Sequence, residues 1–198
     1  MLKMSKRVFL IRHGEALHNV NFNIFGKEAY YHKDNTDAPL THTGKLQATN
    51  LGNKWFNKYE IDLILVSPLT RTLQTANGIF ADMPKLPMVA IDSIKEFPQG
   101  KHTPNIRKTK KELKQYWTDV DFDLVEPFDS FIDKEETEEQ LDDRVNKTKD
   151  YISSLNKDYK NIALVSHSTF ISKFLGHSLE DEDSYGTIEH CWPYPIEI

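Results

Sequence analysis

Cysteine pairs, long hydrophobic runs and an excess of basic residues are all missing from this chain, and each absence excludes a class of protein. The single cysteine, Cys191, cannot form a disulfide within the chain or build a cysteine cage for zinc, and it suits a reducing compartment. No stretch approaches the roughly 18 apolar residues of a membrane-spanning helix. The formal net charge of −5 argues against a general nucleic-acid binder, although a cleft on an acidic protein can still be locally positive.

Length and the first residues set further expectations. The 198 residues fit one domain with a sizeable core, and the chain contains no internal repeat. Only Val8 to Ile11 form an apolar run before Arg12, which is too short for the core of a signal peptide. We therefore expect a single domain over residues 1–198, located in the cytoplasm, with neither a membrane nor nucleic acid as a partner.

Short apolar runs without helical spacing predict strands. Four such runs lie at 8–11, 62–66, about 88–91 and 161–165. The tail, 188–198, is expected to supply a last strand, which Pro193 and Pro195 restrict to an edge of the sheet.

Helical spacing of apolar residues fills the intervals between these strands. Ser67 before Pro68 is typical of a helix start, and Gly176 is typical of a helix end. The pattern Thr137-Glu138-Glu139-Gln140 is a capping box. Helices are expected at about 40–59, 67–80, 137–155 and 169–175. Alternating strands and helices predict an α/β fold, in which a mainly parallel sheet is covered on both faces.

Two segments lack a clear period. Residues 18–40 are interpreted as a loop with one helical turn. Residues 97–135 form an insertion, a candidate cap over the site, with one helix near 107–116 whose basic run 107–114 is expected to be a solvated face. Aromatic side chains in both segments are expected to pack the insertion, with an apolar substrate wall as the alternative: Phe22, Phe25, Tyr30, Tyr31, Trp117, Phe122, Phe128 and Phe131.

Polar groups directly follow three of the predicted strands. These groups are Arg12-His13-Gly14, the stretch from Ser67 to Arg71, and His167. Because an open α/β sheet binds its ligands at the carboxyl ends of its strands, we expect the three groups to converge along one edge. A fixed cation beside an imidazole, with a glycine that allows close backbone approach, suits an anion and above all a phosphate.

In this order and context, the motifs resemble those of the histidine phosphatase superfamily, which contains the cofactor-dependent phosphoglycerate mutases and many phosphatases. The resemblance rests on Arg12-His13-Gly14-Glu15, on the run SPLTRTLQTA at 67–76, and on the strand that ends at His167. It covers about 7–80, 88–97 and 137–176. It implies a three-layer α/β/α sandwich with a mostly parallel central sheet, and a metal-independent reaction through a phosphohistidine without a cofactor.

The residue types themselves suit that reaction. His13 would attack phosphorus with one ring nitrogen while a backbone carbonyl holds the other N–H. The transition state spreads negative charge over three oxygens, and the planar forks of Arg12 and Arg71 match those oxygens. His167 would donate from a second side if the neighbouring dianion keeps it protonated.

A leaving alkoxide also needs a proton, and one carboxyl can supply it and later take a proton from water. Glu96 stands where members of the family carry this acid, soon after the third predicted strand. Asp92 is the competing candidate. A nearby dianion and the apolar Ile94 and Phe97 would both favour the protonated form.

Two further positions have both a functional and a structural interpretation. Asn19 aligns with a polar residue that contacts phosphate in the family, but it equally suits a loop or a helix cap. Ser168 would add a backbone N–H at a helix start. The remaining histidines lack a strand-end context and are expected at the surface: His18, His32, His42, His102, His177 and His190.

Hydrolysis of a phosphorylated small molecule or phosphopeptide is the preferred function, and three alternatives stay open. The first is a phosphoglycerate mutase, but mutases of the family surround the acid with an Arg-His-Tyr-type stretch and carry paired arginines in the insertion, where this chain has Phe97-Pro98-Gln99-Gly100 and a lone Arg107. The second is a metallohydrolase, which the two arginines oppose by repelling a divalent cation. The third is a non-catalytic phosphate-binding module.

Overall fold

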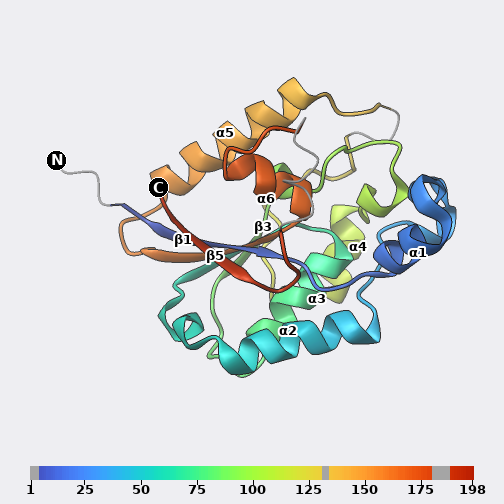
Figure 1. The fold of residues 1–198 in the computed structure, drawn as a ribbon. Coiled ribbons are helices and arrows are strands. Elements are labelled where there is room, and N and C mark those ends of the chain that lie inside the picture. Colours follow the sequence, from blue (N-terminus) through green and yellow to red (C-terminus); the bar gives the residue numbers. More distant parts are fainter. Residues whose placement is uncertain (1–4, 131–133, 180–187) are drawn as a thin grey trace.

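The fold is built on a five-stranded sheet with the strand order β3-β2-β4-β1-β5 (Figure 1). The computed structural model describes residues 5–130, 134–179 and 188–198. Neighbouring strands are parallel except for β5, which pairs antiparallel with β1 at the edge, as Pro193 and Pro195 predict. The strands are β1 (Arg7–Arg12), β2 (Leu63–Val66), β3 (Met88–Ala90), β4 (Asn161–Ser166) and β5 (Pro193–Glu197).

Helices cover both faces of this sheet, which confirms the predicted three-layer α/β fold (Figure 1). One face carries α5 (Glu138–Ser154) and α6 (Ser168–Phe174). The opposite face carries α2 (His42–Lys54) and α3 (Thr70–Ile79). The two remaining α-helices of the described chain are α1 (Leu17–Phe25), which lies beyond the carboxyl end of β1, and α4 (Lys110–Tyr116).

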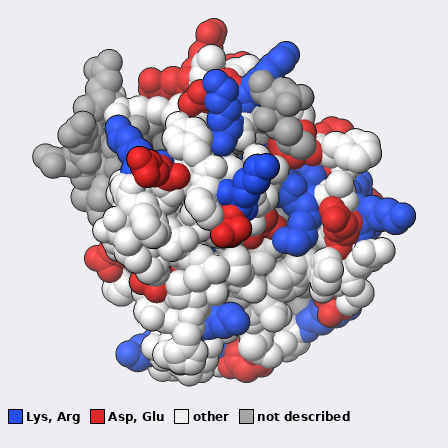
Figure 2. Space-filling model, turned by 90° about the vertical axis from the view of Figure 1, so that its right-hand side faces the viewer, with Lys and Arg blue, Asp and Glu red and all other residues white. Residues whose placement is uncertain are grey.

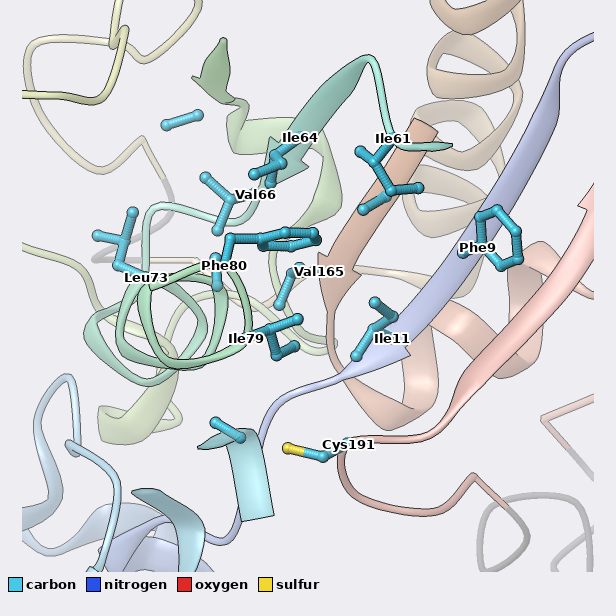
Figure 3. Close-up of a cluster of buried hydrophobic side chains, with 14 of the residues drawn as sticks. Phe9, Ile11, Ile61, Ile64, Val66, Leu73, Ile79, Phe80, Val165 and Cys191 are labelled. Carbon is cyan, nitrogen blue, oxygen red and sulfur yellow. The ribbon is translucent and has the colours of Figure 1, made fainter. Parts of the chain in front are cut away.

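The strands divide their side chains between two hydrophobic cores. In β1, Phe9 and Ile11 enter the core shared with α2 and α3, whereas Val8 and Leu10 enter the core shared with α5 and α6. Figure 3 shows the first core, to which Val165 of β4 also contributes. Because successive strand residues face opposite sides, a sheet buried on both faces produces continuous apolar runs, and this is why its strands were predictable.

Two predicted helices differ from the structure at their ends. Helix α2 ends at Lys54, and Tyr59 lies in a separate 3₁₀ helix, Phe56–Glu60, with a side chain that is 62% exposed. The predicted continuation to Tyr59 is therefore wrong. Helix α3 begins at Thr70 without a side-chain cap, so the expectation that Ser67 caps it is also wrong. Ser67 is fully buried and takes part in the site described below.

The segment 18–40, predicted as a loop with one turn, is mostly helical. It contains the main part of α1 and two 3₁₀ helices, Gly26–Tyr31 and Lys33–Asn35. Helix α1 starts at Leu17, and in its first turn Oδ1 of Asn19 accepts a hydrogen bond from the Ala16 N–H at 2.9 Å. The error has a physical reason: a nine-residue helix with only one buried side chain, His18, shows no apolar stripe in the sequence.

The insertion is attached to the body by buried ion pairs. The guanidinium of Arg107 donates to both carboxylate oxygens of Asp92, at 2.7 and 2.8 Å, and the Lys95 ammonium contacts Asp129 at 2.8 Å. The prediction of a solvated basic face is therefore wrong for Arg107. It holds for Lys111 and other exposed lysines of α4, which lies within the predicted range 107–116.

Most aromatic side chains of these segments pack or lie at the surface. Phe122 is fully buried in the core on the α2–α3 side, and Trp117 packs against that core. Phe128 is largely exposed, whereas Tyr30 lines the cavity described below. Phe131 lies outside the described residues.

Charged side chains of both signs lie at the surface (Figure 2). Figure 2 shows Lys and Arg side chains interspersed with Asp and Glu side chains on the face that it presents. Among the helices of the described ranges, none is long and apolar enough to cross a membrane.

Candidate active site

A polar cavity of about 480 Å³ lies at the carboxyl ends of β1 and β4. It is lined by side chains from the end of β1, from α1 and the turn after it, from the start of the insertion, and from the start of α6. These are Arg12, His13, His18, Asn19, Lys27, Tyr30, Glu96, Phe97, Pro98, His102, Asn105, Ser168 and Thr169. Among the described residues of the insertion predicted at 97–135, those that line this cavity lie at or before Asn105. The expectation that the insertion caps the site stays a prediction.

His13 is buried, and both of its ring nitrogens are engaged. Nδ1 lies 2.7 Å from the Gly14 carbonyl oxygen, and Nε2 lies 3.2 Å from Nε of Arg71. Since an arginine can only donate, Nε2 accepts and Nδ1 carries the proton. Burial, followed by the neighbouring Arg71 cation, holds the pKa of His13 well below its ordinary value. The ring is therefore neutral, with its lone pair on Nε2.

Gly14 allows the turn that follows β1. A Cβ atom at this position would lie 2.5 Å from the Gly44 carbonyl oxygen in α2. The Gly14 N–H donates to Oγ1 of Thr75 at 3.1 Å, which attaches this turn to α3. The close backbone approach that Gly14 allows is thus to α2, and an approach to an anion stays a prediction.

Arg71 is fully buried in the first turn of α3 and is held by the insertion. Its Nη1 donates to the Pro104 carbonyl at 2.6 Å, and its Nη2 donates to Oδ1 of Asn105 at 3.0 Å. Burial lowers the pKa of Arg71 to about 10, so the group is still a cation at neutral pH. The sequence predicted Arg71 near His13, and the structure places it in direct contact.

Arg12 ends β1 and lines the cavity. Its Nη1 donates to the Ile188 carbonyl at 2.8 Å. Its Nε is buried without a hydrogen-bond partner among the described residues. Two guanidinium groups, from Arg12 and Arg71, therefore lie around the neutral ring of His13, and this arrangement attracts anions.

His167 is fully buried after β4, and its ring centroid is 5.2 Å from that of His13. Its Nε2 lies 2.8 Å from Oγ of Ser67. Burial and then Arg71 hold the pKa of His167 well below its ordinary value, so the ring is neutral in this structure. A neutral imidazole still offers one N–H donor. The protonated form expected beside a dianion would need that dianion to be bound.

Glu96 lies in the same cavity, at the start of α6. One carboxylate oxygen accepts from the N–H groups of Phe97 and Phe170, at 2.8 and 3.3 Å. The other accepts from the Ser168 hydroxyl at 3.2 Å and from the Thr169 N–H at 3.4 Å. Four donors therefore face the carboxylate, which the sequence did not predict, while the apolar Phe97 expected beside it lines the same cavity.

Asp92, the competing acid, does not line the cavity. Both of its oxygens accept from Arg107, and one also accepts from the Glu126 N–H at 2.9 Å. This carboxylate fixes the insertion to the body and has no role at the cavity in this structure.

Asn19 and Ser168 both reach the cavity, but their side chains have partners there. Oδ1 of Asn19 caps α1, and its Nδ2 lies 3.3 Å from Nε2 of His18. The capping interpretation of Asn19 is thus confirmed, while a phosphate contact stays a prediction. The same holds for the backbone N–H of Ser168, whose hydroxyl donates to Glu96.

Three histidines predicted at the surface lie at the site instead. The ring of His18 is buried 5.8 Å from that of His13. Nδ1 of His190 donates to the His13 carbonyl oxygen at 2.5 Å. His102 stacks on Tyr30, with ring centroids 4.8 Å apart. Only one sequence signal could have indicated this: His18 follows the strand-end motif closely enough to lie in the first turn of a helix at the cavity.

The described residues contain no group of three or more His, Cys, Asp or Glu side chains that could hold a metal ion. The proposed triad for a metallohydrolase, His13, His167 and Glu96, is therefore not arranged as a metal centre. Two guanidinium groups at the same place would also repel a divalent cation.

Comparison with known proteins places this site in a family. Residues 8–190 match the model of the histidine phosphatase superfamily, branch 1, and the chain belongs to that family. It is 28% identical to a phosphoglycerate mutase-like protein of Arabidopsis thaliana, over 88% of this chain and 75% of the relative. Its fold is similar to that of the alpha-ribazole phosphatase from Shigella flexneri, with a TM-score of 0.66, 25% identity, and coverage of 97% of this chain and 90% of the other.

A third likeness concerns the fold alone. The ecdysone phosphate phosphatase from Bombix mori, solved in complex with tungstate, has a TM-score of 0.64 at 20% identity, over 96% of this chain and 83% of the other. Structural neighbours of this chain thus include phosphatases, and its relatives carry mutase-like names.

Proposed function

We propose that this protein hydrolyses phosphomonoesters through a phosphohistidine on His13. The observation that carries the proposal is the ring of His13, which is neutral, protonated on Nδ1, and fixed with its Nε2 lone pair beside the Arg71 guanidinium. A nucleophile in the correct tautomer, next to donors for the phosphate oxygens, is what phosphoryl transfer requires of a protein.

In the first step, a phosphate oxygen accepts the Arg71 Nε–H in place of Nε2 of His13. The freed Nε2 lone pair then forms a bond to phosphorus as the ester P–O bond breaks. The departing alkoxide takes a proton from the carboxyl group of Glu96 and leaves as the alcohol. Glu96 is then a carboxylate. Arg12 and Arg71 offset the charge on the phosphoryl oxygens. His167 offers an N–H from another side.

In the second step, water gives a proton to Glu96 while its oxygen bonds to phosphorus. The N–P bond breaks, phosphate leaves, and the lone pair returns to Nε2 of His13. Glu96 is then protonated again, so the cycle closes without any other reactant. Asn19 and the Ser168 N–H are proposed as further hydrogen-bond donors to the phosphate oxygens.

Hydrolysis is favoured over a mutase reaction by the state of Arg107. A mutase of this family needs cations in the insertion for the substrate carboxylate, yet Arg107 is buried against Asp92 and does not line the cavity. The substrate class proposed is a phosphorylated small molecule or phosphopeptide, in keeping with a cavity far larger than a phosphate group.

The phosphoenzyme is tested with p-nitrophenyl phosphate carrying labelled phosphate. We expect rapid-quench samples of the wild type to carry an acid-labile, alkali-stable label, as expected of a phosphohistidine, and His13→Ala to carry none. His177→Ala removes an exposed histidine away from the cavity and should label normally. Labelling of His13→Ala would refute the nucleophile, label passed to an added phosphoglycerate in preference to water would favour the mutase, and binding of phosphate without any label would favour a non-catalytic module.

The acid is tested by the leaving group. Glu96→Gln should lower the rate at which an alkyl phosphate such as glycerol 2-phosphate phosphorylates His13 by about 10²- to 10⁴-fold, the usual range for general acid catalysis. Phosphorylation of His13 by p-nitrophenyl phosphate should slow by less than about threefold, because this leaving group needs little protonation. Rapid-quench single-turnover kinetics with both labelled esters measures the phosphorylation step apart from the reaction with water, in which Glu96 is the base for either ester. Equal losses in the phosphorylation rate would show that Glu96 is not the proton donor.

A further inference from the structure

The buried ion pair of Arg144 and Glu136 is hydrogen-bonded to the backbone just before Glu96. Arg144 of α5 donates from Nε and Nη2 to the two carboxylate oxygens of Glu136. Its Nη1 donates to the carbonyl oxygens of Ser93, at 2.9 Å, and Lys95. The guanidinium thus joins α5 to the residues that lead directly into the candidate acid.

The same pair grips the backbone after Glu96. Oε2 of Glu136 accepts from the Gln99 N–H at 3.1 Å, and the Glu136 N–H donates to the Gln99 carbonyl at 3.0 Å. The Arg144 guanidinium also lies over the ring of Phe170, 5.1 Å from its centroid, and the N–H of Phe170 donates to the Glu96 carboxylate. The pair therefore reaches Glu96 from three directions.

Stability alone explains this arrangement poorly. Burying two charges costs desolvation free energy, and buried ion pairs often contribute no more to stability than apolar residues of the same volume. What the pair does provide is geometry: the planar fork of Arg144 fits one carboxylate and two carbonyls at once, which a lysine cannot do.

We propose that Arg144 and Glu136 are positioning residues that hold Glu96 in place for proton transfer. The proposal rests on the proposed function of Glu96 as the acid. Neither Arg144 nor Glu136 lines the cavity, so the pair acts only through the loop and through α6. Small displacements of a catalytic group lower the rate of the step that uses it and leave the other steps intact.

The test uses Arg144→Lys in the full chain. We expect the rate of His13 phosphorylation by glycerol 2-phosphate, measured by rapid quench, to fall by about tenfold, as expected for a displaced general acid, with less than about twofold loss in the same rate for p-nitrophenyl phosphate. Glu136→Gln, which removes one acceptor oxygen, should show the same selectivity and covers the case in which Arg144→Lys fails to fold. Asp82→Asn weakens the ion pair between the buried Lys58 and the exposed Asp82, away from the cavity, and should leave both rates unchanged.

A double variant separates positioning from general damage. In the Glu96→Gln background, Arg144→Lys should cause no further loss on glycerol 2-phosphate, because the group that it positions is already gone. Additive losses, or equal losses on both esters, would overturn the positioning role. If Glu96→Gln itself shows no leaving-group selectivity, the proposed acid fails first, and that outcome is distinct from a failure of Arg144.

Discussion

At the scale of single residues, three other imidazoles surround the ring of His13, and the pKa of each ring depends on its own burial. The ring centroids of His18, His167 and His190 lie 5.8, 5.2 and 5.6 Å from that of His13. Burial is the first cause that lowers the pKa of each, and for His190 the value falls to about 4. The histidine rings at the site are therefore neutral and lie beside two arginines.

These neutral rings predict acid sensitivity. In the unfolded chain, histidines have a pKa near 6.5 and bind protons below that pH. In the folded chain the buried histidines bind protons only at lower pH, because their pKa values are lower. The free energy of unfolding should fall from about pH 6.5 downward, by up to about 1.4 kcal/mol per pH unit for each fully buried ring.

Urea unfolding of the ligand-free protein between pH 7.5 and 5 measures this slope. His18→Asn should make it shallower by the share of one histidine, whereas His177→Ala, at an exposed position, should not. A slope that His18→Asn leaves unchanged would contradict a neutral His18. Phosphate in the buffer should be avoided, since an anion at the site would favour protonation.

At the scale of elements, local signals predicted helices where the sequence carried caps and stripes. Helix α5 begins as its capping box predicts, with Oγ of Thr137 accepting from the Gln140 N–H and the Gln140 side chain returning to the Thr137 N–H. Helix α6 ends before Gly176, which has a φ of 91°. Helix α1 had neither signal and was missed.

The cap of α5 gives a stability prediction. Thr137→Ala should lower the free energy of unfolding by about 1 kcal/mol, because an orphan N–H of the first turn loses its acceptor. Thr137→Ser keeps the oxygen and should cost far less. Urea unfolding compares the two, and equal losses would show that the hydroxyl is not the stabilising group. Activity at low temperature should change little, since Thr137 does not line the cavity.

At the scale of the molecule, the site exists because parallel strands end at one edge. His13 follows β1 and His167 follows β4, its hydrogen-bonded neighbour, while Arg71 follows β2 through the turn at Ser67. The predicted convergence is confirmed by the contacts of His13 with Arg71 and His167. The insertion completes it, since Pro104 and Asn105 hold the Arg71 guanidinium.

The sequence by itself determined the strands, the strand-end residues and hence the class of fold and the centre of the site. These features are local. A strand that is buried on both faces of the sheet has a continuous apolar run in its sequence, and the chain leaves the core where that run stops. Because His13, Arg71 and His167 each follow a strand of a parallel sheet, the sequence predicted that they lie at one edge, although no side-chain contact was known.

Only the tertiary structure decided which charged groups face the cavity and which are buried in pairs. Arg107 looked like a solvated cation and is locked to Asp92, whereas His18 and His190 looked like surface residues and surround His13. Glu96 has donors from α6, more than seventy residues away along the chain. The physical reason is that hydrogen bonds and ion pairs between distant segments leave no periodic pattern in the sequence, so their partners become known only when the chain is packed.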